Sequence, residues 1–280
     1  KVFFGLISAC GSLGASFGGL LVSNYLYDKE NLSLVITIIS MLLAIYFSSR
    51  VERQEQVFKG DSSTFKQVFE QFTQIKENPL IRNFIFYAFI WTCLSTALWF
   101  FQLEIINNFT NDSAVKTQIF GRADSMVPII TLATQLLLTS YFLRSKYLGI
   151  RFVLTMYGVL FTVAFLAVSG YFSEYLLSAS GITLFLILQG TMRPFEYGLN
   201  KPAREAVFTT LSTKEKYKST VFIDTFTNRF GDATGGLLFN SLLSFGLLLY
   251  AAPLAIIPLA IFLINLGWSI SKDIDPVKSK

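Results

Sequence analysis

The chain has 280 residues, a formal net charge of only +5, and 52% hydrophobic against 15% charged residues. Its mean hydropathy of +0.53 exceeds what a soluble domain of this length displays, which excludes an ordinary soluble globular protein and predicts a multispan membrane protein. The chain contains no histidine, the commonest metal ligand and general base. Cys10 and Cys93 lie in apolar runs and indicate no disulfide framework or thiolate metal site. We therefore expect no metal and no cofactor.

Apolar runs near the length that crosses a bilayer predict an all-α, polytopic membrane helix bundle. Eight spans are expected, at about Val2–Tyr27, Leu32–Phe47, Phe84–Ile106, Met126–Phe142, Phe152–Phe172, Leu176–Phe208, Thr220–Leu243 and Leu247–Ile270. Most Lys and Arg residues between these spans fall on the side of Lys1, whereas the opposite side receives only Lys29, Lys116 and Arg122. This asymmetry predicts that both ends of this chain are cytoplasmic.

Small residues recur along the first predicted span. Gly14 and Gly18 are four residues apart and therefore share a helix face, with Ser8, Gly11 and Ala15 nearby. Small side chains let a neighbouring helix approach closely. We expect this face to pack against another helix, which would also suit a pivot for rocking movements.

The longest connection, residues 50–83, is predicted to be cytoplasmic. Apolar residues recur at helical spacing within it, namely Phe65, Val68, Phe69, Phe72 and Ile75. This pattern predicts a helix lying on the inner membrane face or, equally, a linker helix packed on the bundle. Asn78-Pro79 is expected to end that helix before the third span.

Two spans, a long connection and six spans match a twelve-span transporter without its first four helices. We infer a major facilitator-like architecture, in which two six-helix halves rock about a central site. Residues 1–49 would be the last two helices of the N-terminal half, and 84–271 the six-helix C-terminal half. Residues 272–280 would be a cytoplasmic tail. The first residue is lysine, so we expect this chain to be part of a longer one.

The third predicted span carries Thr92, Ser95, Thr96 and Trp99 on one face. Hydroxyl groups beside an indole offer hydrogen bonds and a stacking surface to a ligand base. The alternative is that the hydroxyls bond between helices and that the aromatic side chains anchor the membrane border.

The sixth predicted span is unusually charged for a membrane helix. Arg193, Glu196, Asn200 and Arg204 are spaced to line one stripe, and Lys201 and Glu205 lie on the adjoining flank. Pro194 and Pro202 free backbone carbonyl groups, which transporters tolerate beside a cavity.

The seventh predicted span repeats this pattern. Asp224, Asn228 and Asp232 form a stripe at four-residue spacing, and Arg229 lies beside it. Gly231 and Gly235 allow another helix to pack closely. Each charge at bilayer depth costs about 2.5–3.5 kcal/mol, so the charges of both spans predict a polar transport pathway. The alternative is a set of buried ion pairs: Arg193–Glu196, Lys201–Glu205 and Arg229–Asp232.

A combination of motifs over about forty residues resembles the ATP/ADP translocase family of obligate intracellular bacteria and plastids, with its divergent bacterial relatives. The motifs are Tyr197-Gly-Leu-Asn-Lys-Pro-Ala-Arg-Glu205, Lys214-Glu-Lys-Tyr-Lys218, Ile223-Asp224, Arg229-Phe-Gly231 and Gly235-Gly236. That family is a nucleotide-exchanging branch of the major facilitator fold. The resemblance implies a monomeric ATP/ADP antiporter, or a carrier of a related nucleotide or phosphate, in the bacterial inner membrane, with no enzymatic activity and no nucleic-acid partner.

The resemblance also assigns residues. Lys201 and Glu205 match the lysine-x-x-x-glutamate of the family, and Asp224 and Arg229 match its Ile-Asp and Arg-x-Gly elements. Asp232 departs from the pattern, because the translocases typically carry a lysine there. This anion leaves open another solute, proton coupling, or a relative that senses rather than transports. A membrane-embedded enzyme is a further alternative, although no recognisable catalytic motif supports it.

Overall fold

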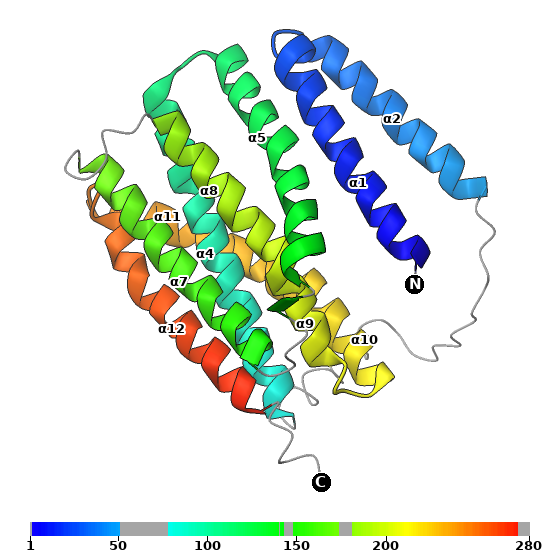
Figure 1. The fold of residues 1–280 in the computed structure, drawn as a ribbon. Helices are drawn as coiled ribbons and strands as arrows, with labels where there is room; N and C mark the ends of the chain where they lie inside the picture. The colour runs from blue at the N-terminus through cyan, green and yellow to red at the C-terminus, as the bar shows by residue number, and fades with distance from the viewer. Residues whose placement is uncertain (1, 51–77, 140, 143–147, 174–180, 274–280) are drawn as a thin grey trace.

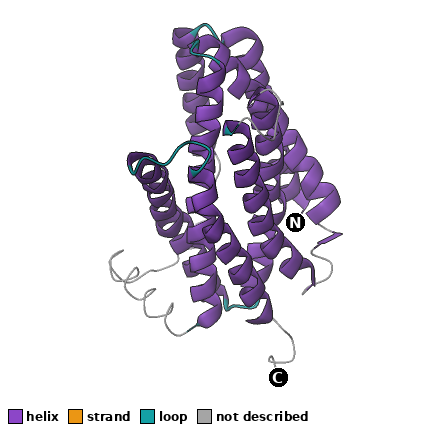
Figure 2. Ribbon diagram, turned by 90° about the vertical axis from the view of Figure 1, so that its left-hand side faces the viewer, coloured by secondary structure: helices purple, strands orange, loops and turns teal. Residues whose placement is uncertain are grey.

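The computed structural model describes residues 2–50, 78–139, 141–142, 148–173 and 181–273 of the 280-residue chain. All regular secondary structure in these ranges is helical, and the helices run roughly alongside one another (Figures 1 and 2). The predicted all-α helix bundle is therefore confirmed. The predicted amphipathic helix, around Phe65–Ile75, and the end of the C-terminal tail lie outside the described residues.

The described chain begins with a helical hairpin. α1 (Val2–Leu21) continues through a π-helical turn, η1 (Val22–Leu26), and α2 (Glu30–Arg50) returns beside it. α4 (Pro79–Phe109) begins after Asn78, whose side chain accepts a hydrogen bond from the Leu80 backbone N–H. α5 (Ser113–Thr134) runs into a second π-helical turn, η2 (Gln135–Thr139).

Two long helices of the second half are each interrupted by a π-helical turn. The first comprises α8 (Gly181–Phe195), η3 (Glu196–Asn200) and α9 (Lys201–Phe208). The second comprises α10 (Thr213–Phe222), η4 (Ile223–Thr227) and α11 (Asn228–Ser244). α7 (Leu148–Phe172) and α12 (Ala252–Asp273) are uninterrupted and pack against each other.

Two helices begin well before the membrane spans predicted within them. The fourth span was expected to begin at Met126, but α5 begins at Ser113, because Asp112 caps it by accepting from the Ala114 N–H at 2.8 Å. The seventh was expected from Thr220, but α10 begins at Thr213 behind a capping box. These caps continue each helix into a polar segment that hydropathy assigns to a loop.

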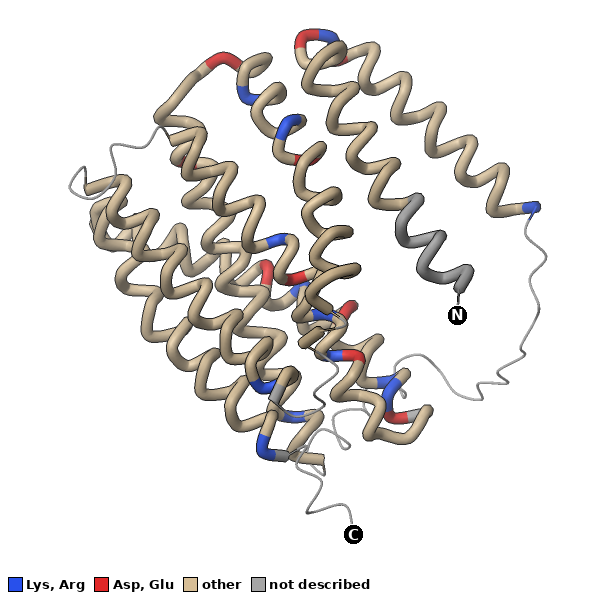
Figure 3. The backbone as a smooth tube through the Cα atoms, in the orientation of Figure 1, with Lys and Arg blue, Asp and Glu red and all other residues tan. Residues whose placement is uncertain are grey.

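The protein is an integral membrane protein. Within the described ranges, helices long and apolar enough to cross a membrane cover Glu30–Arg50, Pro79–Phe109, Gly149–Phe172 and Ala252–Lys272. Charged positions gather near the helix ends, within α5 and where α8 passes into α9, whereas most of α2, α7 and α12 carries none (Figure 3). The eight-span count stays a prediction.

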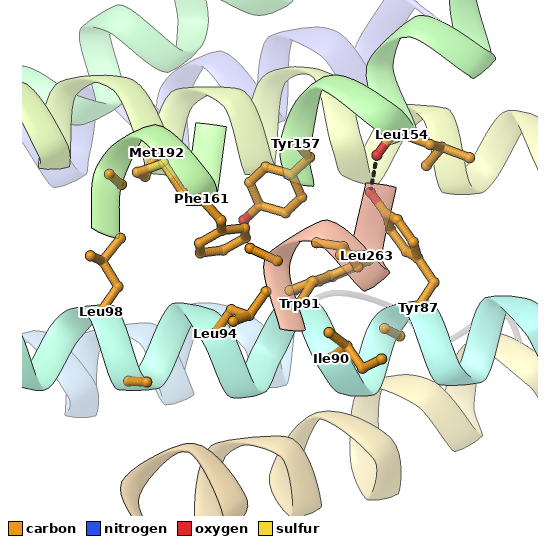
Figure 4. Packing of buried hydrophobic residues seen from close by; sticks show 14 of the residues in the cluster. Tyr87, Ile90, Trp91, Leu94, Leu98, Leu154, Tyr157, Phe161, Met192 and Leu263 are labelled. Atoms are coloured by element: carbon orange, nitrogen blue, oxygen red, sulfur yellow. Dashed lines mark hydrogen bonds between the residues drawn. The ribbon is translucent and has the colours of Figure 1, made fainter. Parts of the chain in front are cut away.

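The hydrophobic core holds α4 between α7, α12 and α8. Tyr87 and Trp91 on one face of α4 meet Tyr157 of α7, and the Tyr87 hydroxyl donates to the Leu154 carbonyl at 2.9 Å (Figure 4). Both tyrosines and the tryptophan are essentially inaccessible to solvent. This aromatic packing fixes α4 against α7.

Glycines make the closest helix contacts, though not all at the expected positions. A Cβ atom added at Gly231 would lie 2.9 Å from Thr92 Cβ, and one at Gly235 would collide with the Cys93 carbonyl, which confirms close packing of α11 on α4. No described residue packs against Gly14 or Gly18, where an added Cβ meets nothing within 4 Å, so their role in helix packing stays a prediction. Gly19, on the neighbouring face of α1, instead packs against the backbone of α5.

Candidate functional site

A cavity of about 420 Å³ opens between α4, the α8–η3–α9 helix and the η4–α11 segment. Its walls combine charged, hydroxyl, amide and aromatic side chains. The lining residues are Trp91, Thr92, Ser95, Thr96, Leu98, Trp99, Gln102, Leu188, Gln189, Met192, Arg193, Glu196, Tyr197, Lys201, Asp224, Asn228, Arg229 and Asp232. A polar cavity bounded by apolar helices is what the charge pattern of the sequence predicts.

Most of the predicted site residues share this cavity. It is lined by Arg193, Glu196, Lys201, Asp224, Asn228, Arg229 and Asp232. The other three predicted residues do not line it: Asn200, Arg204 and Glu205. Asn200 is fully buried and accepts a hydrogen bond from the Tyr87 hydroxyl at 3.0 Å. Its prediction as a solute contact is wrong, because the π-helical turn rotates the stripe and turns Asn200 toward the core.

Pro202 explains why η3 forms beside the cavity. Proline has no N–H group, so the carbonyl groups one turn before it lose their partner. The Lys201 N–H donates to the Glu196 carbonyl five residues back, which leaves the carbonyl groups of Tyr197 and Gly198 free. Side chains of η2 take both: Gln135 Nε2 donates to Tyr197 O at 3.2 Å, and Thr139 Oγ1 donates to Gly198 O.

Removing these two donors is therefore expected to disturb the cavity wall. We predict that Gln135→Leu with Thr139→Val lowers solute affinity several-fold, because two uncapped carbonyl groups would shift η3 and with it Glu196 and Lys201. Thr162→Val is the matched control, since its hydroxyl bonds only to its own helix. Binding measured on purified protein checks the prediction, and unchanged affinity in the double variant would contradict it.

Arg193 does not pair with Glu196 as the sequence predicted. Its guanidinium contacts Asp124 Oδ1 of α5 at 2.9 Å and lies 5.6 Å from the ring centroid of Trp99. Both charged side chains are substantially exposed, at 40% and 58%. Asp124 was missed as a partner because it lies on another helix, 69 residues away in the chain. The resulting pair joins α5 to α8 at the cavity edge.

Lys201 pairs with Glu196 rather than with Glu205. Lys201 Nζ lies 3.5 Å from Glu196 Oε1 and 3.8 Å from the ring centroid of Tyr197. The Tyr157 hydroxyl donates to Glu196 Oε2 at 3.2 Å. Glu196 is only 15% exposed and is satisfied on both oxygens, whereas Lys201 at 32% faces the cavity. Lys201 is thus a cation with a single ionic partner that a bound anion can replace.

A second ionic network lies behind the cavity. Arg204, whose side chain is 7% exposed, donates to Asp224 Oδ1 at 2.7 Å and to Glu205 Oε1 at 3.3 Å. Lys216 of α10 contacts the other oxygen of Glu205 at 3.2 Å. This network ties α9 to α10 and η4. Arg204 and Glu205 are therefore structural side chains here, which corrects their prediction as solute contacts.

Polar side chains of α11 form hydrogen bonds with the hydroxyl groups of α4. Thr92 Oγ1 donates to Asn228 Oδ1 at 3.2 Å, and Thr96 Oγ1 donates to Asp232 Oδ1 at 2.8 Å. The predicted pair between Arg229 and Asp232 is confirmed at 3.6 Å, with Arg229 80% exposed. Thr92 and Thr96 thus bond between helices, and they also line the cavity.

Sequence reasoning missed two glutamines. Gln102 and Gln189 are each 4% exposed, line the cavity and bond to each other, with Gln189 Nε2 donating to Gln102 Oε1 at 2.6 Å. Gln189 has no charge and lies in an apolar run, so the charge pattern did not reveal it. An amide within a membrane span nevertheless indicates a polar neighbour, because a buried amide needs a hydrogen-bond partner.

The site offers exchangeable ion pairs, hydrogen-bonding groups and aromatic surfaces in one cavity. Among the residues that the structure describes, no group of three or more His, Cys, Asp or Glu side chains is placed to hold a metal ion. The cavity can offer charges and hydrogen bonds to a solute. We found no match to this chain among protein-family models, curated proteins or solved structures.

Proposed function

We propose that the chain is part of a secondary transporter that binds a charged organic solute in the cavity and moves it by alternating access. One observation carries the proposal: ionised side chains of two π-interrupted helices line a 420 Å³ cavity between apolar helices. Ionisable groups are expensive at membrane depth and are retained on solute and ion pathways. Interrupted helices with freed carbonyl groups are a further feature of transporter sites.

The solute in the proposal is an anionic nucleotide, exchanged for another in the manner of ATP and ADP. Arg193, Lys201 and Arg229 supply positive charge along one cavity. Guanidinium groups bind phosphate oxygens in pairs, and lysine acts as a mobile point charge. Each cation has a carboxylate partner, so an entering phosphate exchanges for that carboxylate rather than meeting an uncompensated charge. The resemblance to the ATP/ADP translocases gives the same class of solute.

The proposed assembly is a major facilitator-like monomer with eight spans in this chain, in a bacterial inner membrane with both ends of the chain in the cytoplasm. The packing of α1 against α5 through Gly19 supports one bundle containing both segments. Four preceding helices would complete the opposite wall of the cavity.

Exchange measurements test the proposal. Full-length protein in proteoliposomes preloaded with ADP should take up labelled ATP, and Lys201→Ala should reduce uptake about tenfold or more, because it removes a cavity cation and leaves Glu196 without its ionic partner. Lys29→Ala, at an exposed position between α1 and α2, should leave uptake unchanged. Failure of every nucleotide to exchange would exclude this solute class, and equal losses in both variants would exclude a specific role for Lys201.

A carrier for another solute is the second candidate, and Asp232 favours it. With Asp232, which accepts from Thr96 and contacts Arg229, the cavity lining holds as many carboxylates as cations and has no excess positive charge for an anion. A panel of anions, zwitterions and nucleotides compared by thermal stabilisation of the purified protein distinguishes the two candidates, because a ligand stabilises the state that binds it. Strong nucleotide binding without exchange would instead identify a sensing relative.

A further inference from the structure

The cavity changes character along its length. Trp99 of α4 and Arg193 of α8 lie at the same depth in the cavity. Gln102 is three residues after Trp99 on α4, and Gln189 is four residues before Arg193 on α8. The two glutamines, which bond to each other, therefore lie one helical turn nearer the Thr110 end of α4. The carboxylates and Lys201 lie on the other side of the Trp99 level. Leu188, the neighbour of Gln189, also lines the cavity, and no charged lining residue of α4 or α8 lies beyond Arg193 on the amide side.

The amide pair is incompletely bonded. Gln189 Oε1 is buried and has no hydrogen-bond partner within the described chain. The bond between the two side chains uses the oxygen of Gln102 and leaves its Nε2 group as a donor on the cavity wall. Within the described chain, Gln189 Oε1 therefore lacks a donor, and the bond between the two amides does not use Gln102 Nε2. Buried polar groups are rarely left so, and binding sites are where exceptions occur.

We propose that Gln102 and Gln189 form a subsite for a planar heterocycle that carries an adjacent hydrogen-bond donor and acceptor, such as a nucleobase. The free donor and acceptor of the amides match such an edge, as in the bidentate contacts of glutamine with adenine. The Trp99 indole on the same wall offers a stacking surface. The inference rests on the proposed function in one respect, that the cavity is where the solute binds.

The geometry also assigns an orientation to the solute. Its neutral planar head lies at the amide end, and its anionic groups lie toward Arg193 and Lys201. The planar head and the anionic groups of the solute thus contact separate side chains. Their contributions to affinity can therefore be measured separately. A solute that has only one of the two parts should bind more weakly than a solute that has both.

Binding to the full-length protein in lipid nanodiscs tests this subsite with three probes: AMP, adenosine and ribose 5-phosphate. Gln102→Leu with Gln189→Leu removes both amides together, so neither is left buried without the other. We expect AMP and adenosine to bind about tenfold more weakly to this variant, and ribose 5-phosphate to bind equally to both proteins. Gln118→Leu, on α5 away from the cavity, is the matched control and should change none of the three affinities.

A second comparison needs no variant. Purine riboside lacks the exocyclic amine of adenosine and cannot donate to Gln189 Oε1, so it should bind several-fold more weakly to the unaltered protein. Equal binding of the two nucleosides, or unchanged AMP binding in the double variant, would overturn the subsite. Amide-dependent adenosine binding without nucleotide exchange would uphold the subsite and reject the proposed function. Nucleotide exchange that is unchanged by the double substitution would uphold the proposed function and reject the subsite.

Discussion

Gly235→Ala is expected to destabilise the protein strongly and to abolish solute exchange. The added Cβ atom would collide with the Cys93 carbonyl oxygen and would lie 2.9 Å from Thr96 Cβ. The first of these atoms belongs to the backbone of α4, so no rotamer change can relieve the overlap. Overpacking of this kind costs about 1–3 kcal/mol or more. Separation of the helices would also break the bond from Thr96 to Asp232, which forms part of the cavity wall.

Gly190→Ala is the matched control for this prediction. It makes the same change on α8, where the nearest atom is Ile130 Cδ1 at 3.6 Å, an ordinary contact. Its unfolding temperature should equal or exceed that of the unaltered protein, because alanine favours a helix over glycine by about 1 kcal/mol. Thermal unfolding in one detergent, together with exchange in proteoliposomes, measures both effects. Similar stability of the two variants would mean that α11 does not pack on α4 through Gly235.

Arg204→Ala should destabilise the protein by about 2–3 kcal/mol. The Arg204 side chain is almost completely buried and bonds to both Asp224 and Glu205. Without it, the two carboxylates face each other without their common cation, and η4 loses its link to α9. The loss of stability should be smaller than for a fully buried ion pair, because Asp224 and Glu205 are 45% and 43% exposed and can be hydrated.

Arg229→Ala provides the contrast. Arg229 is 80% exposed and its contact with Asp232 is 3.6 Å long, so its removal should leave the unfolding temperature nearly unchanged. It lines the cavity, however, and solute affinity should fall. Thermal unfolding and binding, measured on both variants, separate a structural arginine from a solute-contacting one. A stable Arg204→Ala protein with lost binding would reverse our assignment of the two roles.

The positions of the site helices could be predicted from the sequence because charge within an apolar run is a strong signal. Arg193, Glu196 and Lys201 were singled out in this way and do line the cavity. Their pairing could not be predicted, because local spacing carries no information about a partner on another helix. Arg193 pairs with Asp124, which lies 69 residues away in the chain.

Other differences have local physical causes. The π-helical turn before Pro202 rotates Asn200 out of the stripe that a regular helix would give it. The glycine stripe of α1 was read at a spacing of four residues through Gly14 and Gly18, whereas the contact with α5 runs one position further round the helix, through Gly19. A sequence shows which helix has small residues, but not which of its faces meets a neighbour.

α2 has consequences for the lipids around the protein. No residue of α2 is buried against the rest of the described chain, although it is as apolar as the core helices. Its 21 residues extend about 31 Å, close to the thickness of the hydrocarbon layer, about 30 Å. The van der Waals contacts that side chains give to α4 or α7 must therefore come, for α2, from outside the described residues, either from lipid acyl chains or from further protein helices. Where acyl chains cover this hairpin, tails much shorter or longer than its length would tilt or strain it.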